Sequence, residues 1–294
     1  MNTLTYDRSG KIVLDDIYNQ PDPTAYFSTL QELDYRIPGE AKPVFRRLIE
    51  ARREATGEAS TKVIDVGCSY GINAALLRHD VTMDGLYRLY GDAQATHALL
   101  ARDADLFAEP DDAALEVVGV DVAERAVAYA VRAGVLDAGI AANLEERDPS
   151  ADTIAVLEDA DMVISTGCIG YVSEASMERI VAPSIERRPW MANFVLRMFD
   201  YEPIEALMAR HDYVTEKLDG ALFPQRRFAS EDERDHVLDN LARRGVAADG
   251  AEAEGWYVAE LYVSRPREHV AAAPLVEVLD GLPMPAGLTR LERA

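Results

Sequence analysis

Buried strands alternate with helices between residues 62 and 264, and this alternation constrains the fold more strongly than any other feature of the sequence. Short apolar runs, several of them rich in β-branched residues, are separated by stretches with apolar side chains at helical spacing. The predicted strands are 62–66, 117–121, 140–142, 162–165, 192–199, 213–218 and 256–264. Strands that alternate with helices form a parallel sheet covered on both faces. We therefore predict an α/β fold with a seven-stranded, mostly parallel sheet, helices on both faces and a last strand that can run antiparallel.

Three segments lie outside the alternating pattern. Residues 1–58 predict an amphipathic helical cap, in which residues 37–39 (IPG) end one helix and Pro43 begins the next. Residues 80–112 predict a helical insert after the first strand–helix unit. This insert could form a lid or a subunit contact in a homodimer. Alternatively, it is a surface loop without a functional role. The proline-containing residues 266–294 predict a C-terminal tail that is loosely packed or disordered.

The charge balance limits the classes of partner. The chain has 52 acidic and 30 basic residues among 294, a formal net charge of −22, and 48% hydrophobic residues. An acidic surface repels phosphates, so we predict neither a nucleic acid nor a membrane as partner. The polar start, and the lack of any apolar run of about 18 residues, predict no signal peptide and no membrane span. The two cysteines, Cys68 and Cys168, show no metal-ligand spacing and predict a cytoplasmic protein without a metal site.

The loop after the first predicted strand carries the first functional signal. It runs from Asp65 to Gly71 (DVGCSYG) and leads into a helix. Gly67 and Gly71 allow a sharp turn and let a ligand approach the backbone amides. A dinucleotide fingerprint would need glycine where Ser69 and Ile72 stand, so the loop suits a ligand without a diphosphate. An ordinary strand–helix turn is the alternative.

The second functional signal is Asp121, the last residue of the run VVGVD. A carboxylate at this position can accept hydrogen bonds from both hydroxyls of a ribose. Alternatively, it caps the helix that begins near Ala123. Together with the glycine loop, Asp121 predicts a nucleoside site. The acid stands about 30 residues later than in the dinucleotide fingerprint, which is the reason for predicting an insert.

These residues resemble the class I S-adenosylmethionine-dependent methyltransferases of the small-molecule type. The four segments that carry the resemblance are VIDVGCSYG (63–71), VVGVD (117–121), AANLEERDP (141–149) and DADMVISTG (159–167). The resemblance covers about residues 60–265. It implies S-adenosyl-L-methionine as the cofactor and a Rossmann-like catalytic domain at residues 59–265. We expect the helical cap at residues 1–58 to act as a lid over this domain.

The resemblance also implies a role for the residues at the end of each of four strands. The glycine loop would lie along the methionine part of the cofactor, and its first acid would hold the amino group. The acid that ends the second strand would bind the ribose, the third motif would bracket the adenine, and the fourth would line the reacting end. Apart from the resemblance, Tyr18, Tyr26 and Tyr35 of the cap could close over the cofactor; helical spacing favours a core position for Tyr26, and Tyr35, just before a break, is the preferred candidate. In sequence order, the predicted cofactor residues are Tyr35, Asp65, Gly67, Cys68, Ser69, Gly71, Asp121, Val122, Asn143, Leu144, Ser165, Thr166 and Gly167.

Two residues are candidates for catalysis on the acceptor side. Tyr171 follows the fourth motif, where it either faces the transferred methyl group or packs under the next helix. Arg197, in the fifth predicted strand, offers a guanidinium that could clamp an anionic group. Arg226 and Arg227 could do the same or form surface salt bridges. None of the five histidines directly follows a predicted parallel strand, so a histidine base is not favoured.

The resemblance implies an enzyme that transfers a methyl group in line to a small-molecule metabolite, within secondary metabolism. A second interpretation keeps the cofactor but changes the reaction to aminocarboxypropyl transfer or intramolecular cyclisation. A third is a non-catalytic cofactor-binding module. A nicotinamide oxidoreductase is disfavoured by Ser69 and Ile72. The sequence leaves the acceptor, its attacking atom and the oligomeric state open.

Overall fold

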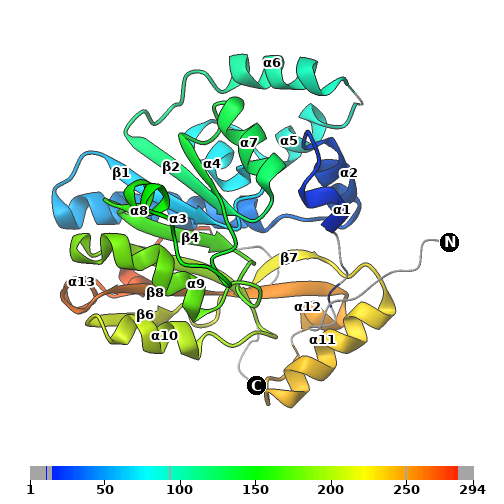
Figure 1. Ribbon diagram of the computed structural model, residues 1–294. Coiled ribbons are helices and arrows are strands. Elements are labelled where there is room, and N and C mark those ends of the chain that lie inside the picture. The colour runs from blue at the N-terminus through cyan, green and yellow to red at the C-terminus, as the bar shows by residue number, and fades with distance from the viewer. Residues whose placement is uncertain (1–10, 12–14, 93, 249, 284–294) are drawn as a thin grey trace.

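The computed structural model describes residues 11, 15–92, 94–248 and 250–283, and one eight-stranded sheet lies at its centre (Figure 1). The strands are β1 (Thr61–Val66), β2 (Leu115–Asp121), β3 (Ala138–Ala141), β4 (Met162–Thr166), β5 (Trp190–Leu196), β6 (Tyr213–Lys217), β7 (Phe223–Arg227) and β8 (Trp256–Pro266). Their order is β3-β2-β1-β4-β5-β8-β6, with β7 paired to β8 outside this path. The pairs among β1 to β5 are parallel, whereas β8 is antiparallel to β5, β6 and β7. The predicted α/β class, the mostly parallel sheet and the antiparallel last strand are confirmed.

The predicted number of seven strands is wrong by one, because β7 was not expected. Its sequence, FPQRR, contains a proline and two arginines and no β-branched residue, so it carries little strand signal. Among the strands that the structure describes, it pairs only with β8, and the register shifts between Pro224 and Arg227. Proline is tolerated at such an irregular edge.

Helices cover both faces of the sheet, as predicted. They are α1 (Asp15–Tyr18), α2 (Thr24–Glu32), α3 (Ile37–Thr56), α4 (Ile72–Arg78), α5 (Met83–Leu89), α6 (Thr96–Leu106), α7 (Glu124–Arg132), α8 (Ala151–Leu157), α9 (Glu174–Val181), the 3-10 helix η1 (Ala182–Arg187), α10 (Glu202–Ala209), α11 (Glu231–Arg243), α12 (Gly250–Ala253), α13 (Arg267–Ala272) and α14 (Leu275–Val278). Alternate strand residues face opposite sides. In β1, Val63 joins a hydrophobic cluster with α3, α4 and α7, and Ile64 joins a second cluster with α8, α9 and α10.

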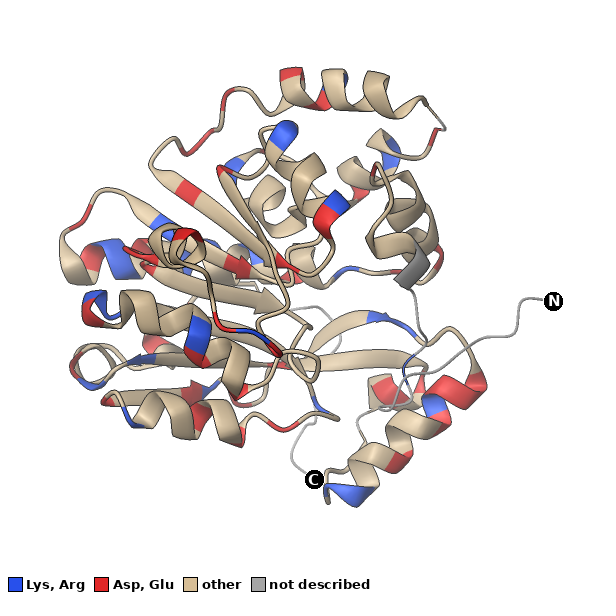
Figure 2. Ribbon diagram, in the orientation of Figure 1, with Lys and Arg blue, Asp and Glu red and all other residues tan. Residues whose placement is uncertain are grey.

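Charged residues occupy the helices on both sides of the sheet. Figure 2 shows acidic positions spread over these helices, with Lys and Arg among them. Within the residues that the structure describes, no helix is both long and apolar enough to cross a membrane.

The N-terminal helices share one hydrophobic cluster with the sheet. The α2 side chains Tyr26, Phe27 and Leu30 are buried in the same cluster as Val63 of β1. Residues 1–10 and 12–14 of the predicted cap lie outside the described residues. The described part of the cap is therefore packed into the core of the molecule.

The helix α3 begins earlier than predicted. Residues 37–39 do not end a helix, because Pro38 stands in the first turn of α3, where a missing amide N–H leaves no hydrogen bond unmade. Pro43 lies inside α3 and does not begin it. Burial of Phe45, Leu48 and the rest of the apolar face outweighs the helical hydrogen bond that Pro43 removes.

The insert adds α5 and α6 to the side of the cap. Tyr90, directly after α5, stacks on Phe27 of α2 with ring centroids 4.6 Å apart. Asp103 of α6 is fully buried and accepts hydrogen bonds from the hydroxyls of Tyr90 at 2.8 Å and of Tyr129 in α7 at 2.6 Å. Arg102 forms an ion pair with the same carboxylate at 2.7 Å. The insert is thereby joined to both the cap and the sheet-covering helix α7.

The segment after β8 is folded, which corrects the prediction of a loose tail for residues 267–283. The stretch LVEVL buries Leu275, Val278 and Leu279. Arg47 of α3 donates a hydrogen bond to the Val278 carbonyl at 2.9 Å. The prediction of a loose tail rested on the proline content and did not take this short apolar pattern into account. Residues 284–294 of the predicted tail lie outside the described residues.

Candidate functional site

The order of strands reverses between β1 and β4, and an open α/β sheet binds ligands at the carboxyl ends of the strands at such a point. The turn after β1 contains three left-handed residues, Gly67, Ser69 and Gly71, with φ values of 72°, 48° and 77°. A Cβ on Gly67 would lie 2.7 Å from the Cβ of Cys168, so a side chain has no room there. A Cβ on Gly71 would lie 2.8 Å from a methyl of Val135, so the contacts of Gly71 are packing contacts.

Asp65, which lies near the end of β1, is the most deeply buried acid of this turn. Its side chain has no exposed surface, and its Oδ1 accepts a hydrogen bond from the Asn73 amide at 2.9 Å. Burial, together with the charge of Asp121, raises the pKa of Asp65 to about 7. The sequence prediction missed Asn73, whose only signal was a polar residue near the start of a helix that is otherwise apolar.

Asp121 ends β2 on the other side of the glycine turn. Its Oδ2 accepts a hydrogen bond from the Ser69 amide at 2.8 Å, and its Oδ1 accepts one from the Ala123 amide at 2.9 Å. The carboxylate therefore supports both the turn and the start of α7, which is the alternative role considered from the sequence. It is half-buried, and each oxygen keeps a further lone pair for a ligand. The next residue, Val122, is 68% exposed.

The third motif places one exposed and one buried residue after β3. Asn143 is exposed, and its Oδ1 accepts a hydrogen bond from the Glu145 amide at 3.1 Å. Leu144 is buried, and its carbonyl accepts a hydrogen bond from Arg179 at 2.7 Å. The Asn143 side chain thus stabilises a turn at the position where the adenine of the cofactor is expected.

The three predicted residues at the end of β4 have different surroundings. The hydroxyl of Ser165 is buried and donates to Asn193 Oδ1 at 2.6 Å, so this side chain is engaged in the core. The hydroxyl of Thr166 accepts a hydrogen bond from the Asn73 amide at 3.2 Å. Asn73 thereby links Thr166 to Asp65. Gly167 is left-handed, with φ 86°, and the end of the Gln225 side chain lies against it.

The cap contributes Tyr35 to this group. The side chain of Tyr35 interacts with the hydroxyls of Tyr26 and Thr166, and burial raises its pKa well above the usual range. The Tyr35 carbonyl accepts a hydrogen bond from the hydroxyl of Tyr87, which lies in α5. Tyr35, which was predicted from the sequence, thus contacts both the insert and the end of β4.

The two predicted catalytic residues differ in availability. Tyr171 is 49% exposed and meets the ring of Phe199 edge-on, with centroids 6.2 Å apart. Arg197 pairs with buried Glu252 at 2.6 Å and donates to the Ala247 carbonyl at 2.9 Å. The Arg197 guanidinium therefore fastens α12 to the end of β5, and two of its three nitrogens donate hydrogen bonds within the fold.

The arginines of β7 and the two cysteines have structural contacts. Arg226 pairs with Glu233 of α11 at 2.8 Å, and both side chains are buried. Arg227 is exposed and stacks on Trp256 at 4.1 Å. Burial raises the pKa of the Cys68 thiol well above its usual range and that of Cys168 to about 12, so both remain protonated.

Four buried polar atoms around the turn have no hydrogen-bond partner among the described residues. They are Asp65 Oδ2, Ser69 Oγ, Asn73 Oδ1 and Gln225 Oε1. All four can accept a hydrogen bond, and buried polar groups are rarely left unpaired in proteins. The arrangement is therefore complementary to a ligand that brings hydrogen-bond donors or a positive charge.

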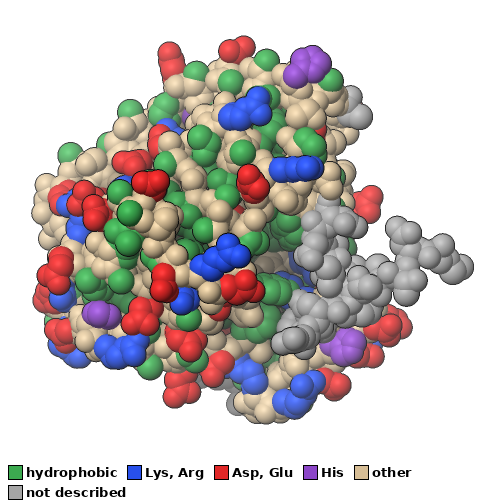
Figure 3. Space-filling view, viewed as in Figure 1, with side chains coloured by type: hydrophobic (Ala, Val, Ile, Leu, Met, Phe, Trp, Pro, Cys, Tyr) green, Lys and Arg blue, Asp and Glu red, His purple; other side chains and the backbone are tan. Residues whose placement is uncertain are grey.

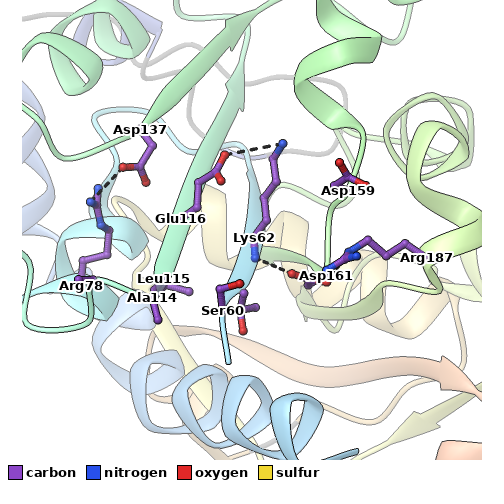
Figure 4. Close-up of a pocket in the computed structure, with 12 residues that line it drawn as sticks. Ser60, Lys62, Arg78, Ala114, Leu115, Glu116, Asp137, Asp159, Asp161 and Arg187 are labelled. Atoms are coloured by element: carbon purple, nitrogen blue, oxygen red, sulfur yellow. Dashed lines mark hydrogen bonds and ion pairs between the residues drawn. The ribbon is translucent and has the colours of Figure 1, made fainter. Parts of the chain in front are cut away.

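A groove of about 510 Å³ lies at the opposite, amino-terminal edge of the sheet (Figure 4). Its three cations are ion-paired: Lys62 with Glu116, Arg78 with Asp137, and Arg187 with Asp161. The groove therefore contains no unpaired cation among the described residues for an anionic ligand. On the face drawn in Figure 3, basic side chains are likewise interspersed with acidic and apolar ones.

No protein-family model matches the chain, and no curated protein matches its sequence. Several solved structures are similar. The plantazolicin methyltransferase BpumL in complex with SAH is 11% identical, with 86% of this chain and 93% of that chain covered, at a TM-score of 0.44. Magnesium protoporphyrin IX methyltransferase from Synechocystis PCC 6803 with bound SAM is 11% identical, with 76% and 78% covered, at a TM-score of 0.38. The YcgJ protein from Bacillus subtilis is 12% identical, with 75% and 98% covered, at a TM-score of 0.40. All three TM-scores lie below 0.5.

Proposed function

We propose that this chain is a class I S-adenosylmethionine-dependent methyltransferase that transfers a methyl group in line to a small-molecule metabolite. One observation carries the proposal. Asp65 and Asp121, at the ends of the neighbouring strands β1 and β2, flank a left-handed turn at residues 67–71. One is a fully buried carboxyl with an unpaired oxygen, and the other is a half-buried carboxylate at the position of a ribose-binding acid.

The residues present fit this cofactor. The side chains of Asp65 and Asn73 are hydrogen-bonded to each other, and each keeps one unpaired oxygen, Asp65 Oδ2 and Asn73 Oδ1. These oxygens would accept hydrogen bonds from the ammonium group of the cofactor. Asp121 would use its remaining lone pairs to accept the ribose hydroxyls. The exposed side chain of Val122 would offer apolar surface to the adenine. When bound, the cofactor supplies a methyl group on a positively charged sulfur.

The chain itself has to align the acceptor and exclude water, because an activated donor does not require a strong base from the protein. Tyr35 and Thr166 lie where the reacting end is expected, and Tyr26 closes this side with a buried ring. Since burial raises the pKa of Tyr35, its hydroxyl stays protonated and can donate a hydrogen bond. We assign it an orienting role.

We propose a catalytic domain at residues 59–265 under a cap at residues 1–58, an acceptor from secondary metabolism, and a cytoplasmic location. The formal net charge of −22 disfavours nucleic acid and anionic membranes as partners. The packed helices of cap and insert favour a compact acceptor over a macromolecule.

Replacing Asp121 with alanine should weaken the binding of S-adenosylhomocysteine by roughly 1–3 kcal/mol, because ribose hydroxyls lose a charged partner. This corresponds to a dissociation constant about 5- to 150-fold higher, which titration calorimetry can measure. Asp105→Ala, an exposed acid on α6, is the matched control and should leave the affinity unchanged. Equal affinities for the two variants would contradict the assignment of the ribose site.

The reaction itself is tested by incubating the protein with S-adenosylmethionine and a panel of small nucleophiles, followed by chromatography. We expect S-adenosylhomocysteine and a methylated product in equal amounts. Methylthioadenosine in place of S-adenosylhomocysteine would show that a different carbon of the cofactor is transferred.

A further inference from the structure

Gln225 of β7 is a buried amide whose carbonyl oxygen has no partner within the described part of the chain. Its side chain is 4% exposed, and Oε1 accepts no hydrogen bond. An unpaired buried carbonyl is unfavourable, and a hydrogen-bond donor from a ligand would remove that penalty. No structural contact described above needs this amide, so a ligand is the natural partner.

The amide lies beside the reacting end of the proposed site. A Cβ on Gly167 would lie 1.9 Å from Gln225 Nε2, so the amide rests on the only residue type that leaves room for it there. Gly167 follows Thr166, whose hydroxyl interacts with Tyr35. Gln225 is thus adjacent to the expected reacting end of the site, whereas Asp121 and Val122 lie at the end of β2.

The backbone of Gln225 is held by the cap. Its carbonyl accepts a hydrogen bond from the Arg36 amide at 2.8 Å, and the Arg227 amide donates to the Leu33 carbonyl at 2.6 Å. The guanidiniums of Arg36 and Arg227 lie over the ring of Trp256 at 4.3 Å and 4.1 Å. These contacts fasten the segment that carries Tyr35 to β7, so Gln225 and Tyr35 are positioned together.

The charges nearby indicate which ligand group the amide would receive. Arg226, the next residue, is neutralised by two hydrogen bonds to Glu233 at 2.8 and 3.0 Å. The Lys11 ammonium lies over the rings of Tyr171 at 5.0 Å and Tyr257 at 5.6 Å. Three of the four unpaired atoms around the turn, Asp65 Oδ2, Asn73 Oδ1 and Gln225 Oε1, are carbonyl or carboxyl oxygens that accept hydrogen bonds. A ligand group with N–H or O–H donors can bind the carbonyl oxygen of Gln225, whereas a carboxylate has no hydrogen to donate to it.

We propose that Gln225 binds the methyl acceptor: its Oε1 accepts a hydrogen bond from an amine, amide or hydroxyl group of the substrate. This inference rests on the proposed function and adds the substrate class to it. Gln225 is assigned to the acceptor and not to the cofactor, so its effects should be confined to acceptor binding.

The test uses Gln225→Met, which keeps the length of the side chain and removes the amide, with exposed Gln31→Met as the control. The probes are benzamide, which has N–H donors, and benzoate, which has none. Binding to the full-length protein saturated with S-adenosylhomocysteine is measured by saturation-transfer NMR. We expect benzamide to bind the wild type and benzoate to bind more weakly. Gln225→Met should weaken benzamide binding by about tenfold or more, because a hydrogen bond to a buried partner is lost.

Two further readouts separate this role from a structural one. The affinity of Gln225→Met for S-adenosylhomocysteine should stay within about twofold of the wild type. Its Tm without ligand should rise by roughly 1–4 °C, because an unpaired buried carbonyl is removed. A lower Tm, unchanged benzamide binding, stronger binding of benzoate, or no binding of either probe would overturn the inference. A wild type that fails to bind S-adenosylhomocysteine would instead reject the proposed function.

Discussion

Asp103→Ala should lower the free energy of unfolding by roughly 3–5 kcal/mol, because it removes a buried charged partner and leaves other buried groups unpaired. The Asp103 carboxylate has no exposed surface and accepts hydrogen bonds from Tyr90 and Tyr129 as well as from Arg102. The two tyrosine hydroxyls would be left without this partner. Since Tyr90 also stacks on Phe27, the loss would loosen the contact between insert and cap.

Urea denaturation followed by circular dichroism measures this effect, and Asp105→Ala on the same helix is the control. Asp105 is exposed, so its replacement should change stability by no more than about 0.5 kcal/mol. Asp103→Asn should fall between the two, since an amide retains an acceptor but not the charge. If Asp103→Ala unfolded at the same urea concentration as Asp105→Ala, the buried carboxylate would not be what joins the insert to the core.

Local sequence patterns were sufficient for the parallel part of the fold. The strands β2 and β4 carry apolar runs, VVGV and MVI, because both of their faces are covered by helices, and such runs are visible without a structure. The acids at the ends of β1 and β2 are fixed by position along the chain, so Asp65 and Asp121 could be selected from the sequence. Their placement beside one turn follows from the pairing of β1 with β2.

Residues that depend on contacts distant in sequence could not be selected in the same way. Asn73 matters because its amide reaches Thr166, which is 93 positions further along the chain. Gln225 matters because an irregular edge strand, held by the backbone of the cap, carries it to Gly167. Arg197 illustrates the opposite error, since its pairing with Glu252 was invisible in the sequence and the arginine seemed available for a substrate.

Asp65→Asn should stabilise the ligand-free protein above pH 7. Burial raises the pKa of Asp65 from its ordinary value of 3.8 to about 7, so the fold favours the neutral acid. The stability that this group contributes is complete below about pH 4 and is lost as the pH rises through about 7. Asparagine has no such proton to lose and can still accept the hydrogen bond from Asn73. The variant should therefore exceed the wild type by up to roughly 4 kcal/mol at pH 8.

Ligand binding should change in the opposite direction. An ammonium group requires the ionised form of Asp65, so the affinity of the wild type for S-adenosylhomocysteine should rise by up to about tenfold per pH unit between pH 5 and 7. Asp65→Asn should lose this dependence and bind roughly 10- to 150-fold more weakly at pH 8. Thermal denaturation and titration calorimetry at four pH values measure both effects, with Asp105→Asn as the control for a change of net charge.

The two measurements together distinguish a binding carboxylate from a structural one. If Asp65 served only the fold, through Asn73, its replacement by asparagine would leave the affinity of the folded protein for S-adenosylhomocysteine unchanged. A variant that is more stable without ligand and yet binds poorly requires a different cause: the buried, unpaired Oδ2 is unfavourable in the free protein and becomes favourable only when a positive ligand group meets it.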